Sequence, residues 1–144
     1  MSTISDVLAK KGTDVATISP DGSVLHAANL MNERRIGALC VVRDGNLVGV
    51  FTERDILTRV VSAQLDPATT RVADVMTSPV ITCGPRGRTE DCAAVMSHER
   101  IRHLPVVDGG KLVGIVSTGD LMALQVAESQ AFIDHLYEYL HGRT

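Results

Sequence analysis

The sequence has few aromatic residues. They make up 3% of its 144 residues, and tryptophan is absent. The chain therefore lacks the stacking platforms on which proteins bind single-stranded nucleic acid. Its net charge of −3, with acidic and basic residues mixed along the chain, gives no broad positive field for a phosphate backbone. We expect no nucleic-acid partner.

Long apolar runs are also lacking. No stretch reaches the roughly 18 apolar residues of a membrane span, and the first residues, MSTISDVLAKKG, contain no apolar signal-peptide core. We therefore expect a cytoplasmic protein without a membrane partner.

Cysteine is scarce, with three residues and no CxxC spacing. Cys40, Cys83 and Cys92 each lie among apolar or small residues, which predicts reduced thiols in the core. A metal site of Cys83, Cys92 and His98 is the alternative, but its spacing matches no known ligand pattern. A Gly-rich phosphate loop with lysine and a metal-binding acid cluster are also lacking, so we expect no nucleotide hydrolase.

What the chain does contain is a duplication. IGALCVVRDGNLVGVFTERDIL, from Ile36, aligns without a gap with IRHLPVVDGGKLVGIVSTGDLM, from Ile101, at a shift of 65 (101 − 36). Further upstream, Asp6 and Asp74 correspond at a shift of 68 (74 − 6), so the first copy carries three extra residues (68 − 65) around positions 10–14.

Each copy predicts the order strand, helix, strand, strand, helix. In the first copy we expect a strand at 16–18, a helix on the apolar spacing of 24, 27, 28 and 31, and a hairpin of 38–42 and 47–51. A second helix should run from Glu53 to about Ala63. The fold class is α/β (α+β), with two β-α-β-β-α repeats packed sheet to sheet about a pseudo-two-fold axis, because one copy is too short for a core. Expected boundaries are 1–66, 67–128 and a C-terminal helical extension at 129–144.

Two short motifs give the sequence its family resemblance. Both follow a hairpin and read Gly-h-h-[ST]-x-x-Asp, where h is apolar: GVFTERD at 49–55 and GIVSTGD at 114–120. Residues 5–127 thereby resemble a tandem pair of CBS domains, the Bateman module. The resemblance implies a non-catalytic regulatory module that binds AMP, ADP, ATP or S-adenosylmethionine between the repeats, requires no further cofactor or metal, and acts on a protein target not identified by the sequence.

The motif residues have two compatible interpretations. Thr52 with Asp55, and Ser117 with Asp120, have the spacing of helix capping boxes. An aspartate at that place can also accept hydrogen bonds from a ribose diol, and the free N–H groups of the helix end suit a phosphate.

The resemblance also implies which residues form each cleft. Around Asp120 it gathers these: Ser117, Thr17, Ile18, Ile36, Gly37, Ala38, Arg102 and His103. Around Asp55 it gathers these: Thr52, Arg54, Thr82, Cys83, Ile101 and Arg102. The basic pair Arg102 and His103 corresponds to Gly37 and Ala38 in the first copy, so the clefts are unequal and the second-repeat cleft is favoured. The alternatives are that the apolar members are plain core and that Arg102 is a solvated surface residue.

The C-terminal segment carries an apolar stripe on a helix expected to continue from Leu121: Phe132, Ile133, Leu136, Tyr137 and Leu140. The stripe either packs on its own domain or contacts a second copy, and an exposed stripe favours a homodimer. Two rival functions remain: a structural dimerisation module with empty clefts, and an enzyme fragment related to inosine monophosphate dehydrogenase.

Overall fold

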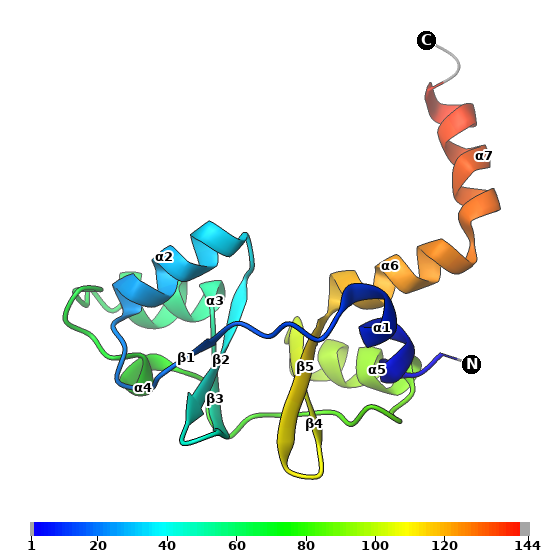
Figure 1. Cartoon of the computed structure of the whole chain (residues 1–144). Coiled ribbons are helices and arrows are strands. Elements are labelled where there is room, and N and C mark those ends of the chain that lie inside the picture. Colours follow the sequence, from blue (N-terminus) through cyan, green and yellow to red (C-terminus); the bar gives the residue numbers. More distant parts are fainter. Residues whose placement is uncertain (1, 142–144) are drawn as a thin grey trace.

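The computed structural model describes residues 2–141 and contains two similar halves joined side by side (Figure 1). The first half of the chain forms α1 (Ile4–Lys11), β1 (Thr17–Ile18), α2 (Val24–Arg34), β2 (Ala38–Arg43), β3 (Asn46–Thr52), α3 (Glu53–Asp55) and a π-helix (Ile56–Val61). The second half forms α4 (Val72–Val75), α5 (Thr89–Glu99), β4 (His103–Asp108), β5 (Lys111–Ser117), α6 (Thr118–Glu128) and α7 (Gln130–His141). The α+β repeat architecture is confirmed.

Both predicted hairpins are present and have the same geometry. β2 pairs antiparallel with β3, and β4 with β5, each with a register shift at corresponding positions. Each turn contains two residues with positive φ, namely Asp44 and Gly45 (52° and 80°) and Gly109 and Gly110 (56° and 83°). Two left-handed residues give the twist that a tight hairpin needs.

The first strand differs between the copies. β1 pairs parallel with β2, and the Cys40 amide donates to the Ala16 carbonyl at 3.1 Å. The residue equivalent to Cys40 is Pro105, which has no N–H to donate. In the second copy the expected strand is therefore reduced to one bridge, between Cys83 and Val106.

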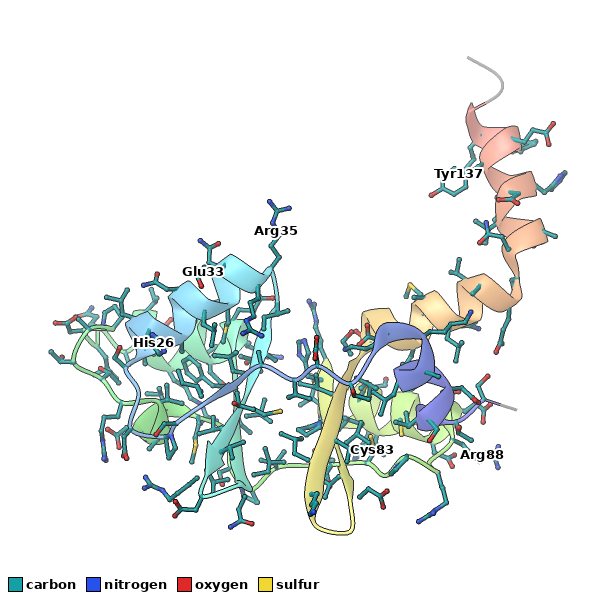
Figure 2. The ribbon with its side chains drawn as sticks, viewed as in Figure 1. His26, Glu33, Arg35, Cys83, Arg88 and Tyr137 are labelled. Atoms are coloured by element: carbon teal, nitrogen blue, oxygen red, sulfur yellow. The ribbon has the colours of Figure 1, made fainter. Side chains whose placement is uncertain are left out.

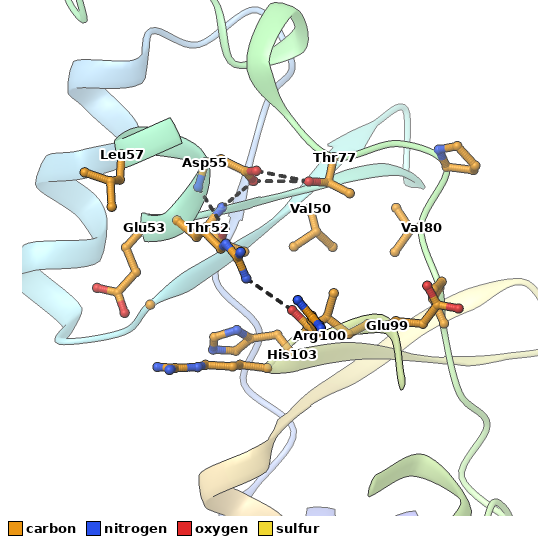
Figure 3. A pocket seen from close by; sticks show the side chains of 16 residues that line it. Val50, Thr52, Glu53, Asp55, Leu57, Thr77, Val80, Glu99, Arg100 and His103 are labelled. Atoms are coloured by element: carbon orange, nitrogen blue, oxygen red, sulfur yellow. Dashed lines mark hydrogen bonds between the residues drawn. The ribbon is translucent and has the colours of Figure 1, made fainter. Parts of the chain in front are cut away.

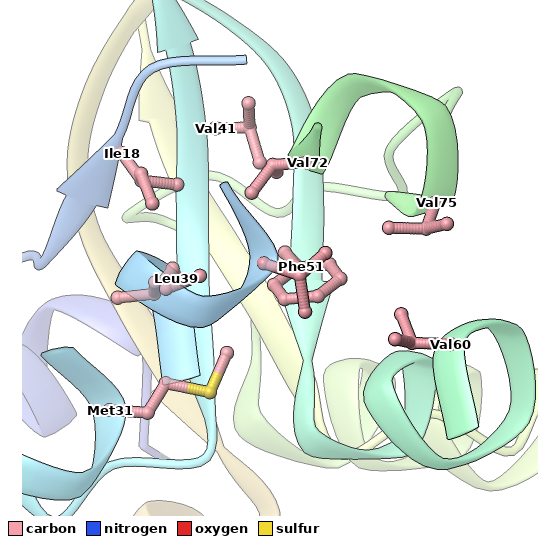
Figure 4. Close-up of a cluster of buried hydrophobic side chains, with 10 residues drawn as sticks. Ile18, Met31, Leu39, Val41, Phe51, Val60, Val72 and Val75 are labelled. Carbon is pink, nitrogen blue, oxygen red and sulfur yellow. The ribbon is translucent and has the colours of Figure 1, made fainter. Parts of the chain in front are cut away.

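Each hydrophobic core borrows a helix from the other half of the sequence. The first core contains Phe51 and Val60, but also Val72 and Val75 of α4 (Figure 4). The second core is built on α5, β4, β5 and α6 together with α1, which supplies the buried side chains Ile4, Val7 and Leu8. Figure 1 shows α1 beside α5 and α6, across the molecule from β1, which follows it in the sequence. The two halves therefore exchange their first helices.

Two helices depart from expectation. The helix beginning at Glu53 continues as a π-helix over 56–61 and not as a regular α-helix. The C-terminal helix does not continue unbroken from Leu121, because Ser129 has non-helical angles (φ −117°, ψ 27°) and ends α6. Serine bonds readily to nearby backbone and so favours helix ends. α7 projects from the body with Tyr137 on it, and the side chains of Phe132 and Leu140 are largely exposed (Figure 2).

Among residues 2–141, no helix combines the length and hydropathy needed to cross a bilayer.

Candidate functional site

A cavity of about 740 Å³ lies between the two copies (Figure 3). The first copy contributes the end of β3 and the start of α3, and the second copy contributes the segment after α4 and the loop from α5 into β4. Lining residues are Gly37, Val50, Thr52, Glu53, Arg54, Asp55, Leu57, Thr77, Pro79, Val80, Ile81, Glu99, Arg100, Ile101, Arg102 and His103. The volume falls within the range of about 300–1,000 Å³ that is typical of small-molecule sites.

Asp55 is the buried carboxylate of this cavity, with 6% of the residue exposed. Its Oδ2 atom accepts from the Thr52 amide at 3.0 Å, and the Thr52 hydroxyl accepts from the Asp55 amide at 3.2 Å. The Thr77 hydroxyl donates to Oδ1 at 3.1 Å, and Arg59 lies 3.7 Å from the same oxygen. The capping box predicted from the sequence is therefore present, and it holds the carboxylate at the cavity wall.

Basic groups line the same cavity. Arg54 follows the N-cap of α3 and donates to the carbonyl of Arg100 at 3.4 Å. Arg102 and His103 enter from the start of β4, so the structure brings them to Asp55. Burial and then the nearby Lys11 ammonium lower the pKa of His103, although Asp120 opposes this effect. His103 is therefore neutral at pH 7 and offers a hydrogen bond, while the arginines supply the positive charge.

Several lining residues carry no expectation from the sequence. Thr77, Pro79, Val80 and Ile81 belong to the segment after α4, and Arg100 is the left-handed C-cap of α5. Thr77 lies in the part of the repeat where the shift changes from 68 to 65, so the alignment gives it no counterpart with a role. The repeated arginine at 35 and 100 is the one available signal for Arg100.

The second carboxylate, Asp120, lies outside this cavity and has a different partner. Its Oδ2 atom accepts from the Ser117 amide at 2.8 Å, which completes the second predicted capping box. The same oxygen accepts from Lys11 Nζ at 2.5 Å, and Lys11 also donates to the carbonyl of Ile115 at 2.7 Å. Burial raises the pKa of Asp120, but the hydrogen bonds from Lys11 and Ser117 outweigh it, and the net shift is downward.

The remaining predicted site residues are divided among several places. Gly37, which the resemblance assigns to the Asp120 cleft, and Ile101, which it assigns to the Asp55 cleft, both line the 740 Å³ cavity. Ile18 is buried in the first core, Ile36 packs against it and Ala38 is buried. Thr17 and Thr82 are exposed, and Cys83 packs on the second core. None of these three residues lines the cavity.

A related pair of shallower grooves lies on the helices. One, of about 380 Å³, is lined by Ala28, Met31, Asn32, Arg35, Ile36, Gly37, Glu53 and Ile56. The other, of about 440 Å³, contains the eight residues 65 positions later (such as 93 − 28), with Arg54, Met122 and Gln125 in addition. The duplication therefore produces matched surfaces as well as matched cores.

The three cysteines are free thiols, of which Cys40 and Cys92 are buried and Cys83 is partly buried. Burial raises the pKa of Cys40 to about 12, and burial followed by the neighbouring Cys92 raises that of Cys83 to about 12. Within residues 2–141 there is no cluster of three or more His, Cys, Asp or Glu side chains that could hold a metal. Cys83, Cys92 and His98, the alternative metal site, therefore do not form such a cluster.

This chain is thus a duplicated α+β unit with a mixed apolar and charged cavity between its two copies. The CBS domain model matches residues 4–62 and 72–127, and the chain belongs to this family. It is 39% identical over 131 residues to the CBS domain-containing protein YhcV of Bacillus subtilis, covering 91% of each chain.

Solved structures agree with this family. One is that of a putative signal-transduction protein with CBS domains from Burkholderia ambifaria, which is 40% identical, with a TM-score of 0.85 and coverage of 88% of this chain and 95% of that one. The CBS domain pair of protein MJ0100, solved with 5-methylthioadenosine and S-adenosyl-L-methionine, is 27% identical, with a TM-score of 0.78 and coverage of 89% and 98%.

The alternative of an enzyme fragment is supported only by similarity to a small part of the enzyme. Inosine-5'-monophosphate dehydrogenase of Korarchaeum cryptofilum is 37% identical over 109 residues, which is 75% of this chain but 22% of that enzyme.

Proposed function

We propose that this chain is a regulatory module that binds a phosphate-bearing adenosine ligand in the cavity between its repeats. The observation that carries the proposal is the meeting of one buried carboxylate with Arg54, Arg102 and His103 around a single 740 Å³ space. The solved pair with 5-methylthioadenosine and S-adenosyl-L-methionine supports an adenosine-type ligand.

Each part of such a ligand has a suitable counterpart. Asp55 is an acceptor for a ribose diol, because a carboxylate has about four acceptor sites and two neighbouring hydroxyls can share them. Val50, Val80 and Ile101 provide an apolar wall for adenine. Arg54 and Arg102 provide charge-assisted hydrogen bonds for phosphate. The sequence favours the Asp120 cleft, but the large cavity adjoins Asp55, so we assign the first ligand to the Asp55 cavity.

Calorimetric titration of the full chain with AMP, ATP and S-adenosylmethionine tests this function. We expect Arg102→Gln to weaken AMP binding about tenfold, because a charge-assisted hydrogen bond is lost. Arg86→Gln is the matched control, since it removes the same charge from an exposed residue outside the cavity lining. Absence of binding by all three ligands at millimolar concentration would overturn the proposal.

The proposed role is regulatory and not catalytic. Overnight incubation of the full chain with ATP should return the nucleotide unchanged, whereas a protein-dependent product would contradict this role.

The proposed assembly is a homodimer that uses the matched helix grooves. The linings of the two grooves correspond at a shift of 65 residues, and a two-fold axis would bring the same pair of grooves of a second copy against them.

A further inference from the structure

Asp120, around which the family resemblance implies a second cleft (the Asp120 cleft), already has a cationic partner supplied by the chain itself. Lys11 Nζ bonds both the Asp120 carboxylate and the Ile115 carbonyl, at 2.5 and 2.7 Å. Its side chain is 30% exposed and that of Asp120 24%, so the pair lies at a partly open surface. Lys11 therefore occupies acceptors that a bound ribose would need.

The first copy fills the same place in a different way. Val50, the counterpart of Ile115 at the 65-residue shift, exchanges two backbone hydrogen bonds with Thr77, at 3.0 and 2.8 Å. The Thr77 hydroxyl also donates to Asp55 at 3.1 Å. At Asp55 the neighbouring strand carbonyl and the carboxylate are thus satisfied by the Thr77 backbone and hydroxyl. At Asp120 the Lys11 side chain satisfies both.

This difference makes the occupant of the second cleft movable. A backbone bridge is held by its two neighbours along the chain, whereas an ammonium on a four-carbon stem can turn about its single bonds. The Cα atom of Lys11 stays in place, because it ends α1, which is anchored in the second core by Ile4, Val7 and Leu8. Lys11 can therefore leave Asp120 without α1 leaving the domain.

The chemistry of the ligand then decides whether Lys11 leaves. A neutral nucleoside that takes Asp120 would leave the ammonium without its carboxylate, and charge-assisted hydrogen bonds are about twice as strong as neutral ones. A ligand that also carries a phosphate offers Lys11 a new anionic partner.

We infer that Lys11 is the specificity-determining residue of the Asp120 cleft, which admits adenosine ligands that carry a phosphate and disfavours neutral ones. This inference rests on the proposed function, because it assumes that adenosine ligands bind between the repeats.

The test compares AMP with adenosine, which differ only in the phosphate. Titrations of the full chain are followed through the backbone amides of Gly119 and Asp120, in the first turn of α6, which report on the Asp120 cleft. The Thr118 amide is not used, because it donates to the carbonyl of Arg102, which lines the Asp55 cavity. In the natural sequence these amides should respond to AMP at about a tenfold lower concentration than to adenosine.

Four variants separate charge from structure. Lys11→Met and the second neutral variant Lys11→Gln should abolish the preference for AMP, while Lys11→Arg should keep it. Lys10→Met is the matched control, since it removes an equal charge from the neighbouring exposed residue of the same helical turn and should leave the preference intact.

The outcomes distinguish the two proposals. A preference that survives in both neutral Lys11 variants overturns the inference. So does AMP binding that perturbs only amides around Asp55, although the proposed function then stands. If no amide responds to AMP in any of the proteins, the proposed function itself fails.

Discussion

The two motif carboxylates are a buried Asp55 and a partly open Asp120, and their partners set their properties. Asp55 accepts a hydrogen bond from the neutral hydroxyl of Thr77, and its cationic partner, Arg59, lies farther away at 3.7 Å. Asp120 is paired directly with an ammonium. Residues that correspond in the duplicated sequence therefore differ in charge balance, because their tertiary neighbours come from segments that do not align.

The Asp120 pair should give a pH-dependent contribution to stability. The pKa of Asp120 is lower in the folded chain than in the unfolded one, so its contribution is present above about pH 4 and is lost as the pH falls through the folded-state pKa. Asp120→Asn should reduce the free energy of unfolding by about 1 kcal/mol at pH 7, for a partly exposed pair, and by less at pH 3. Urea unfolding at both pH values measures the difference.

Asp14→Asn is the control, because it removes a carboxylate from an exposed loop residue. An Asp120→Asn effect of the same size at pH 3 and pH 7 would contradict the ionic origin of the contribution.

At the residue scale the sequence predicts what is local. Thr52 with Asp55 and Ser117 with Asp120 lie three positions apart, and each pair forms its capping box as expected. The bond from Lys11 to Asp120 joins residues 109 positions apart. Propensity and spacing contain no information on such a contact, so the lysine could be placed only by the folded structure.

The helix ends provide the clearest feature at the scale of elements. Arg35 is the C-cap residue after α2 and Arg100 the one after α5. Both have left-handed angles (φ 54° and 57°), where helices commonly have a glycine. A side chain in this conformation costs about 1 kcal/mol relative to glycine. The Arg35 side chain points away from the body in Figure 2.

We therefore expect Arg35→Gly to stabilise the chain by about 0.5–1 kcal/mol, because the cost of the left-handed conformation is removed. Arg34→Gly, one residue earlier and still inside α2, should destabilise it by a similar amount, about 1 kcal/mol. Thermal unfolding of the two variants measures both effects. Shifts of the same sign would mean that Arg35 contributes contacts that outweigh its backbone conformation.

The elements themselves were largely predictable. Alternating apolar runs around Gly-containing turns gave both hairpins, and the change from Cys40 to Pro105 accounts for the shortened first strand of the second copy. The order predicted for each copy begins with a strand and includes neither α1 nor α4, so these two helices were not predicted. The exchange of α1 and α4 between the halves could not be derived for that reason.

At the scale of the whole molecule, the matched grooves predict an interface between two copies. The full chain should sediment as a dimer, and Ala93→Arg, which introduces a charge into one groove, should shift it towards monomer by at least about tenfold in dissociation constant. Ala127→Arg is the matched control, an exposed alanine of α6 outside the groove lining. Sedimentation velocity measures all three proteins. A monomeric natural sequence, or equal effects of the two substitutions, would contradict this interface.

The exchanged helices mean that the units of sequence are not the units of folding. A gene divided in the 63–71 segment between the matched CBS regions would yield one polypeptide whose first core lacks Val72 and Val75, and another whose second core lacks Ile4, Val7 and Leu8. Neither product could complete its interior alone, yet mixed together each would carry the helix that the other needs. We therefore expect the two repeats to unfold together as one cooperative unit, although the sequence contains the same unit twice.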